Sequence, residues 1–104
     1  MINKDISIRE LQKHIKEIDF KPEFKLQVML KLVEEVGELA VEVRRESMGT
    51  LSPELKDKIK YELYDILHFV NHMANIYDID LVEAIVEKDK INAIKYKRKE
   101  GKKW

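Results

Sequence analysis

Four acidic residues form two pairs with the same spacing, and this spacing suits metal binding. Two residues separate Glu35 from Glu38, and two residues separate Glu62 from Asp65. Residues three apart on a helix are surface neighbours, so each pair would present two carboxylates on one helical face. If the two helices pack antiparallel, all four carboxylates can meet in one pocket. Such an all-oxygen cluster suits a hard divalent cation, above all Mg²⁺ or Mn²⁺.

The surroundings of these acids make the pattern more informative than exposed glutamates would be. On a helical wheel, Glu62 falls inside a broad apolar sector and Asp65 lies at its edge. A carboxylate that faces a core is strongly disfavoured unless it is paired or binds a metal. The earlier helix has a wide apolar sector, and the wedge left over holds Glu34, Glu35, Glu38 and Glu42. Like charges at this spacing repel unless cations compensate. For Glu34 and Glu42, a solvated acidic face is an equal alternative.

The last part of the chain shows the opposite pattern, with polar side chains on an apolar arc. Lys88, Asn92 and Lys95 fall within the arc of a helix whose other members are apolar or aromatic. Lys95 is expected to extend its charged end to water at the rim. Lys88 and Asn92 lie one turn apart and would face the carboxylate pocket. Carboxylate-bound Mg²⁺ with a nearby lysine is a general device for holding polyphosphate.

Capping residues and prolines indicate the elements that must position these side chains. Ser7 and Asp80 each precede a glutamate by three residues, which is the form of a capping box. Pro22 and Pro53 suit the first turn of a helix. Together these signals predict helices at about 8–18, 22–46, 53–77 and 80–99. Short connections favour antiparallel neighbours, so we expect an all-α fold. It would be an antiparallel bundle of one short and three long helices, forming a single domain over residues 1–104.

Composition excludes several other classes of protein. Lys and Arg (20) balance Asp and Glu (20), and a net charge of zero argues against nucleic acid as a partner. The absence of cysteine excludes disulfides, zinc–thiolate sites and a cysteine nucleophile. No apolar run exceeds three residues, so no membrane span is expected. These features predict a cytoplasmic protein.

The acidic motifs resemble those of a known family. The stretch from Lys31 to Ala40 (KLVEEVGELA) resembles the EExxE signature of the MazG-like nucleotide pyrophosphohydrolases. The stretch from Tyr61 to Leu67 (YELYDIL) resembles their second motif, ExxD. Further on, the spacing of Lys88, Asn92 and Tyr96 resembles the phosphate-contacting helix of the short dCTPase-like members. The resemblance covers about residues 7–98.

The resemblance implies an enzyme that hydrolyses nucleoside triphosphates, often deoxynucleoside triphosphates, between the α and β phosphates. The products would be a nucleoside monophosphate and pyrophosphate. Mg²⁺, with Mn²⁺ as an alternative, would be held by Glu35, Glu38, Glu62 and Asp65. The family works as homodimers or dimers of dimers, with the substrate pocket near the subunit interface. That assembly fits the wide apolar sector of the helix at 22–46, which one chain of this size could hardly cover.

The resemblance also implies roles for residues beside the metal ligands. Glu34 would orient or deprotonate the attacking water. Lys88 would stabilise charge on the departing phosphates, and Asn92 and Tyr96 would position them.

Three alternatives remain open from the sequence. One is a phosphoribosyl-ATP pyrophosphohydrolase-like activity, because those enzymes share a double glutamate and a stretch like the one from Asp65 to His68. Another is a di-metal carboxylate bundle with redox chemistry, which the Asp65–His68 spacing matches in part. The third is a non-catalytic oligomerisation bundle, in which Glu62 pairs with Lys88.

Overall fold

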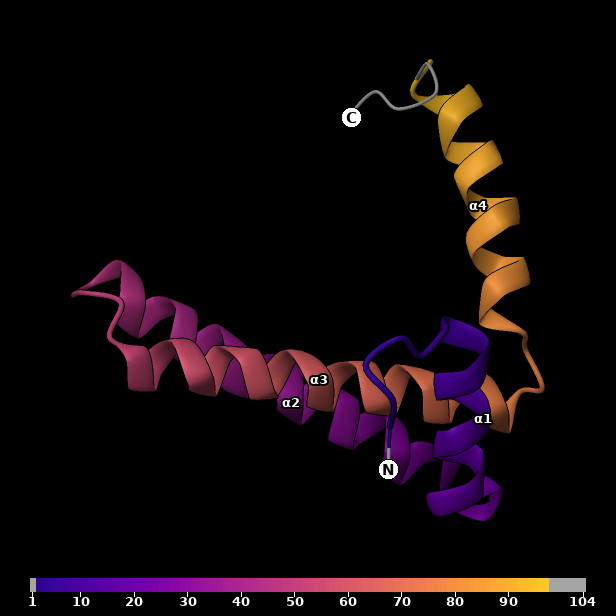
Figure 1. The fold of residues 1–104 in the computed structure, drawn as a ribbon, viewed down its shortest axis with the longest axis horizontal. Coiled ribbons are helices and arrows are strands. Elements are labelled where there is room, and N and C mark those ends of the chain that lie inside the picture. Colours follow the sequence, from indigo (N-terminus) through magenta and orange to yellow (C-terminus); the bar gives the residue numbers. More distant parts are fainter. Residues whose placement is uncertain (1, 98–104) are drawn as a thin grey trace.

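The computed structural model describes residues 2–97, and all regular structure in that range is helical (Figure 1). Its elements are α1 (Ile8–Ile18), the 3-10 turn η1 (Pro22–Phe24), α2 (Lys25–Ser47), α3 (Pro53–Ile76) and α4 (Leu81–Lys95). The predicted all-α class with four helices is confirmed. α4 ends at Lys95, earlier than predicted, and residues 98 and 99 of the predicted range lie outside the described residues.

Side-chain caps fix where the helices begin. The Ser7 hydroxyl accepts a hydrogen bond from the Glu10 N–H, and the Glu10 carboxylate accepts one from the Ser7 N–H, both at 3.1 Å. This reciprocal pair is the predicted capping box. Ser52 accepts from the backbone three residues on, ahead of Pro53 at the first position of α3. Asp80 caps α4 through its own carboxylate, which accepts from two N–H groups of the first turn.

The start of α2 differs from the sequence prediction. The chain from Pro22 to Phe24 forms a 3-10 turn, closed by a 3.0 Å bond from the Phe24 N–H to the Lys21 carbonyl. The α-helix itself begins at Lys25. The Lys21 N–H is held at 3.0 Å by Nε2 of His72 on α3, which ties this turn to the neighbouring helix. Proline therefore opens the tighter turn that precedes the helix, and not the helix itself.

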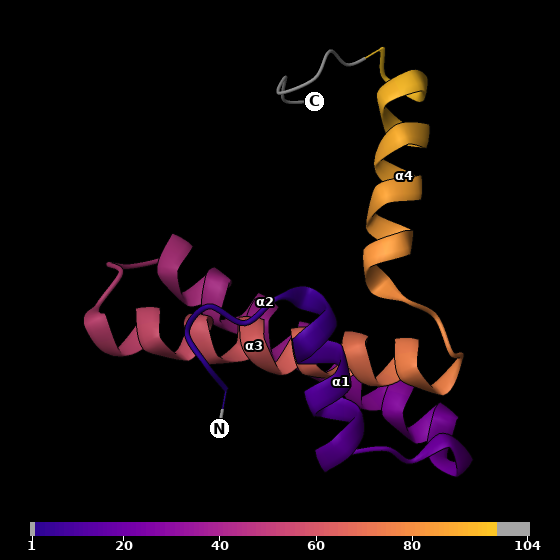
Figure 2. The same ribbon diagram turned by 45° about the vertical axis from the view of Figure 1, so that its right-hand side comes forward.

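α2 and α3 run antiparallel side by side and form a long hairpin, as both ribbon views show (Figures 1 and 2). α1 packs across the end of the hairpin where α2 begins and α3 ends. The buried apolar side chains of the described residues lie at this crossing: Leu11, Ile15, Val28 and Ala74. The arm of the hairpin beyond the crossing has no third helix against it within the described part of the chain.

α4 leaves the side-by-side arrangement and projects away from the hairpin, with its first turn against α1 (Figures 1 and 2). Gln12 on α1 fixes the direction of α4 by binding two backbone groups, one in the connection between α3 and α4 and one in the first turn of α4. Its amide donates to the Ile79 carbonyl at 2.6 Å, and its oxygen accepts from the Leu81 N–H at 3.0 Å. An ion pair of 2.8 Å between Arg9 and Asp80 adds a second link. These contacts hold the start of α4 on α1 and not along α3.

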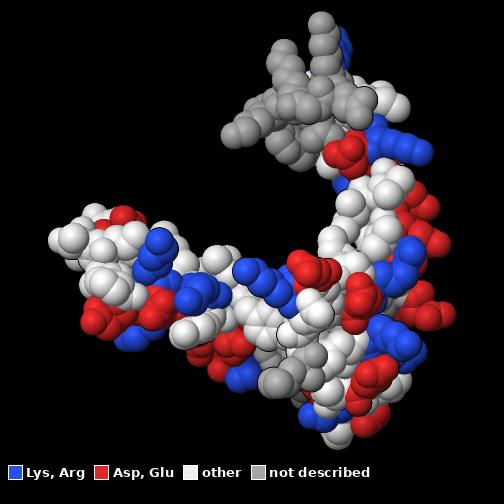
Figure 3. Space-filling model, viewed as in Figure 1, with Lys and Arg blue, Asp and Glu red and all other residues white. Residues whose placement is uncertain are grey.

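Much of the apolar surface stays exposed in the single chain. Leu30 and Val33 on α2 are 58% and 55% exposed, and Ile94 on α4 is 81% exposed. In the space-filling view, the side of α4 that faces the hollow above the hairpin is largely uncharged, whereas the outer side carries Lys, Asp and Glu (Figure 3). Exposed apolar side chains of this number are typical of surfaces that contact another protein. Within residues 2–97, no helix is long and apolar enough to cross a membrane.

Candidate active site

The hairpin brings the predicted carboxylates together. Oxygens of Glu35 on α2 and of Glu62 and Asp65 on α3 all lie within 4.8 Å of one another. Oxygens of Glu34, Glu35 and Glu38 form a second group within the same limit. Glu35 belongs to both groups and is only 7% exposed, so it joins the acids of the two helices. The i,i+3 spacing on each helix and the antiparallel packing together produce this cluster.

Glu62 carries the clearest sign that the cluster suits a cation. Its Oε2 atom is buried and has no hydrogen-bond partner among the described residues. Three effects raise the pKa of Glu62 to about 7: hydrogen bonding to Glu35, shielding from water, and the negative charges of Glu35 and Glu38. Each of these effects penalises the ionised form. A divalent cation would give the orphaned oxygen a partner and would neutralise the repulsion, so the donor set fits a hard metal ion.

Lys31 provides the local positive charge. Its Nζ lies 3.3 Å from Glu34 Oε1 and 3.8 Å from Glu35 Oε1, in i,i+3 and i,i+4 positions of α2. Hydrogen bonding to Glu34 and the nearby carboxylates raise the pKa of Lys31. Glu34 itself is exposed and lies at the edge of the cluster. One lysine does not balance this many acids, which leaves net negative charge for a cation to meet.

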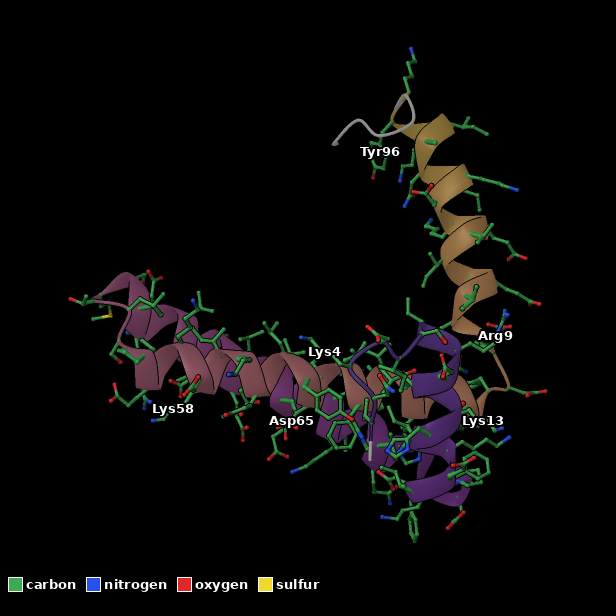
Figure 4. The ribbon with its side chains drawn as sticks, viewed as in Figure 1. Lys4, Arg9, Lys13, Lys58, Asp65 and Tyr96 are labelled. Carbon is green, nitrogen blue, oxygen red and sulfur yellow. The ribbon has the colours of Figure 1, made fainter. Side chains whose placement is uncertain are left out.

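The residues predicted on the last helix lie elsewhere. Lys88 and Asn92 are on α4, and Tyr96 follows its last turn. Figure 4 shows Tyr96 at the far end of α4, well away from Asp65 on the hairpin. Within one chain the structure therefore does not bring these three side chains to the carboxylates. No ion pair joins Lys88 to Glu62 in the described range, so the pairing expected of a non-catalytic bundle is not formed.

An open pocket adjoins the acid cluster at the base of the hairpin. It has a volume of about 460 Å³ and is lined by Asp19, Lys21, Phe24, Gln27, Val28, Lys31, Phe69 and His72. This volume lies within the range of small-molecule sites, and the mixture of apolar walls with a few polar groups is typical of them. Lys31 lines the pocket and also contacts Glu35, so the pocket and the carboxylates share a wall.

Asp19 joins the pocket to two histidines of α3. Its Oδ2 lies 2.8 Å from His68 Nε2 and 3.5 Å from His72 Nδ1. Burial alone would raise the pKa of Asp19, but the hydrogen bond to His68 and the contact with the Lys21 ammonium lower it below its usual value. Burial, the largest effect, lowers the pKa of His72. Because His72 Nε2 accepts from the Lys21 N–H, the proton of the neutral ring resides on Nδ1, which has no hydrogen-bond partner among the described residues.

Asp19 and His72 carry no signal in the sequence, and His68 has one only in its spacing from Asp65. No spacing rule links position 19 to positions 68 and 72, because the contact depends on how α1 crosses α3. The geometry also separates His68 from the acid cluster. Its ring meets Asp19, and in the described residues it belongs to a different group from Asp65. The partial match to a di-metal redox site is therefore not supported by this arrangement.

The fold and the site together define an all-helical protein with a carboxylate cluster suited to a metal ion and a ligand pocket beside it. The family model of the MazG nucleotide pyrophosphohydrolase domain matches residues 24–92. The chain therefore belongs to the MazG family and is a nucleotide pyrophosphohydrolase. The matched range contains Glu35, Glu38, Glu62 and Asp65, as well as Lys88 and Asn92.

Solved structures agree with this assignment. Two crystal structures of iMazG from Vibrio DAT 722 superpose on the chain with TM-scores of 0.71 and 0.73 at 36% and 37% identity. The first covers 84% of this chain and 98% of the iMazG chain, and the second covers 89% and 100%. A comparison with curated protein sequences gives no significant match.

Proposed function

We propose that this enzyme hydrolyses nucleoside triphosphates, in particular deoxynucleoside triphosphates, between the α and β phosphates. The products are a nucleoside monophosphate and pyrophosphate, and the reaction depends on Mg²⁺. The observation that carries this proposal is the meeting of Glu35, Glu62 and Asp65 across the hairpin, with a buried Glu62 oxygen that lacks a partner among residues 2–97. A polyphosphate is the kind of substrate for which such a cation-binding cluster is useful.

Glu35, Glu38, Glu62 and Asp65 would hold the metal. When bound, Mg²⁺ neutralises phosphate oxygens and lowers the pKa of a bound water, and Mn²⁺ could substitute because it prefers the same ligands. Glu34 is exposed at the edge of the cluster and is the carboxylate we assign to orienting or deprotonating the water. The Lys31 ammonium lies 3.3 Å from its Oε1.

Lys88, Asn92 and Tyr96 can reach a nucleotide only if α4 extends over another subunit. We propose a homodimer, or a dimer of dimers, in which α4 of one protomer contributes these residues to the site of its partner. Two observations support this: α4 projects away from its own hairpin, and its side towards the hollow is largely uncharged (Figures 1 and 3). Residues 1–104 would form one domain in this assembly.

The direct test measures pyrophosphate release from a panel of deoxynucleoside and ribonucleoside triphosphates with and without Mg²⁺. We expect Mg²⁺-dependent release of pyrophosphate together with the monophosphate, and its loss in Glu62→Gln and Asp65→Asn. Asp57→Asn is the matched control, because Asp57 is an exposed carboxylate of the same helix. Release of inorganic phosphate in place of pyrophosphate, or full activity in chelator, would refute the proposal.

Complementation tests the contribution of α4. Lys88→Ala and Glu62→Gln are each expected to be inactive, and the two variants are unfolded together, mixed and refolded. If Lys88 acts on the partner's site, half of the dimers carry one intact site of two, which restores about a quarter of wild-type activity. If Lys88 acted within its own chain, the mixture would stay inactive.

A further inference from the structure

We infer that Lys31 is a further catalytic residue, which changes its partner when the substrate binds. In the metal-free protein its ammonium pairs with Glu34 and Glu35. When Mg²⁺ and the nucleotide are bound, the ammonium contacts a phosphate oxygen instead. The inference rests on the proposed hydrolysis of nucleoside triphosphates, and it adds to that proposal a cation that the acidic hairpin itself supplies to the substrate.

The position of Lys31 places it in competition with a metal ion. Its Nζ lies 3.3 Å from Glu34 Oε1 and 3.8 Å from Glu35 Oε1, and Glu35 is the buried acid that belongs to both carboxylate groups. Among the residues that the structure describes, no other lysine or arginine forms an ion pair with an acid of these groups. A dication bound to Glu35 would repel an ammonium at this distance. Metal binding therefore favours the departure of Lys31 from this carboxylate.

The side chain of Lys31 is held loosely enough to move. It is 46% exposed, and its ion pairs with Glu34 and Glu35 are i,i+3 and i,i+4 contacts within one helix. Contacts of this kind contribute little to stability, because the ammonium remains largely hydrated and a long, flexible side chain must be held in one conformation. Lys31 can therefore exchange one anionic partner for another with little change in the free energy of the protein.

A phosphate group of the substrate is the anion that can receive Lys31. The side chain lines the open pocket beside the carboxylates, so it lies where that pocket and the acids meet. A triphosphate bound through the metal would lie against the same acids, and lysine binds phosphate oxygens as a compact point charge. Lys88 of the α4 helix is proposed to act on the departing phosphates, so we assign Lys31 to the α phosphate. Its move also frees Oε1 of Glu34 for the attacking water.

Lys31→Met tests both parts of this exchange, because it keeps most of the side-chain length and removes the charge. Calorimetry with Mg²⁺ and no nucleotide should give a Kd roughly three- to tenfold tighter than that of the wild type, since the competing charge is gone. At saturating Mg²⁺, kcat/KM for a deoxynucleoside triphosphate should fall roughly 10- to 100-fold, which corresponds to one hydrogen bond to a charged group. Lys31→Arg keeps the charge and should return the Kd for Mg²⁺ to the wild-type value.

Lys60→Met is the matched control, because Lys60 forms an i,i+3 ion pair with Asp57 on the other helix of the hairpin and, within the described range, none with the acid cluster. It should change neither quantity. A Kd for Lys31→Met that is equal to or weaker than that of the wild type would overturn the inference. An unchanged kcat/KM at saturating Mg²⁺ would also overturn it, because Lys31 would then be a counter-ion only.

Two further measurements keep the outcome unambiguous. If Lys31→Met does not fold, Lys31→Gln removes the same charge and gives the same two readings. Absence of hydrolysis by the wild type would refute the proposed function and with it the phosphate contact. The Kd for Mg²⁺ is measured without nucleotide, so it separates that failure from a failure of the inference alone.

Discussion

The carboxylate cluster predicts that metal affinity changes with pH in a specific way. The metal binds the ionised carboxylate, so Glu62 must lose its proton before it can become a ligand. With a pKa of about 7 in the metal-free protein, Glu62 is half protonated near neutral pH. The protonated fraction is about 0.9 at pH 6 and about 0.1 at pH 8, so the apparent Kd for Mg²⁺ should be roughly tenfold weaker at pH 6 than at pH 8.

Calorimetric titration with Mg²⁺ in two buffers of different ionisation enthalpy measures both the affinity and the protons released. About half a proton should leave on binding at pH 7, rising towards one at pH 6. Glu62→Gln should bind Mg²⁺ more weakly and with little pH dependence, because the titrating group is gone. A wild-type Kd that stays constant from pH 6 to pH 8, with no proton release, would refute the assignment of Glu62 as a ligand.

The ionisation of Glu62 also affects the stability of the metal-free protein. A salt-bridged acid stabilises the folded state when it loses its proton, whereas Glu62 destabilises the folded state when it does so. The folded pKa of Glu62 is raised from the usual 4.5 to about 7, so the folded state holds this proton more tightly than the unfolded state. Its contribution to stability is therefore complete below about pH 4.5 and is lost as the pH rises through 7. The Tm of Glu62→Gln relative to wild type should increase from pH 5 to pH 8 in chelator, and Mg²⁺ should reverse the order at pH 8.

Three further predictions follow from the same geometry. Lys88→Ala should leave the Tm nearly unchanged without nucleotide but lower kcat severely, because Lys88 is exposed on α4 and would act on the leaving pyrophosphate. Gln12→Ala removes the partner of the Leu81 N–H and should cost about 1–3 kcal/mol in urea unfolding, whereas the exposed neighbour Lys13→Ala should change it by less than about 0.5 kcal/mol. Sedimentation should show at least a dimer at micromolar concentration, and a well-behaved monomer would contradict the proposed assembly.

Local signals in the sequence were sufficient to predict the hairpin and its acids. Ser52 and Pro53 mark the start of α3, and the i,i+3 spacing of Glu62 and Asp65 then sets the face that meets α2. Glu62 was recognisable because a carboxylate in an apolar sector needs a partner. These features depend on periodicity within single helices and on one short connection, which is why they can be read from a sequence.

The direction of α4 and the contacts of Asp19 could not be read in the same way. The path of the chain between α3 and α4 is set by Gln12, which lies 69 residues from its partner Leu81. Asp19 meets His68 across 49 residues. Both contacts follow from how α1 crosses the hairpin, and a crossing of this kind leaves no periodic trace in sequence. The apolar residues of α4 marked one face of the helix, but gave no sign that this face stays exposed in the single chain.

The unequal burial of the two ends of the molecule connects the proposed assembly to catalysis. The buried apolar side chains of the described residues lie where α1 crosses the hairpin, while Leu30, Val33 and Ile94 remain more than half exposed. Burial of apolar surface is the main favourable term in folding, so a chain with so small a core would gain much of its stability from the proposed association. The residues proposed to hold the phosphates lie on the helix that has the least support from its own chain. A second copy that covers the exposed faces would therefore stabilise the protein and complete the site in a single step.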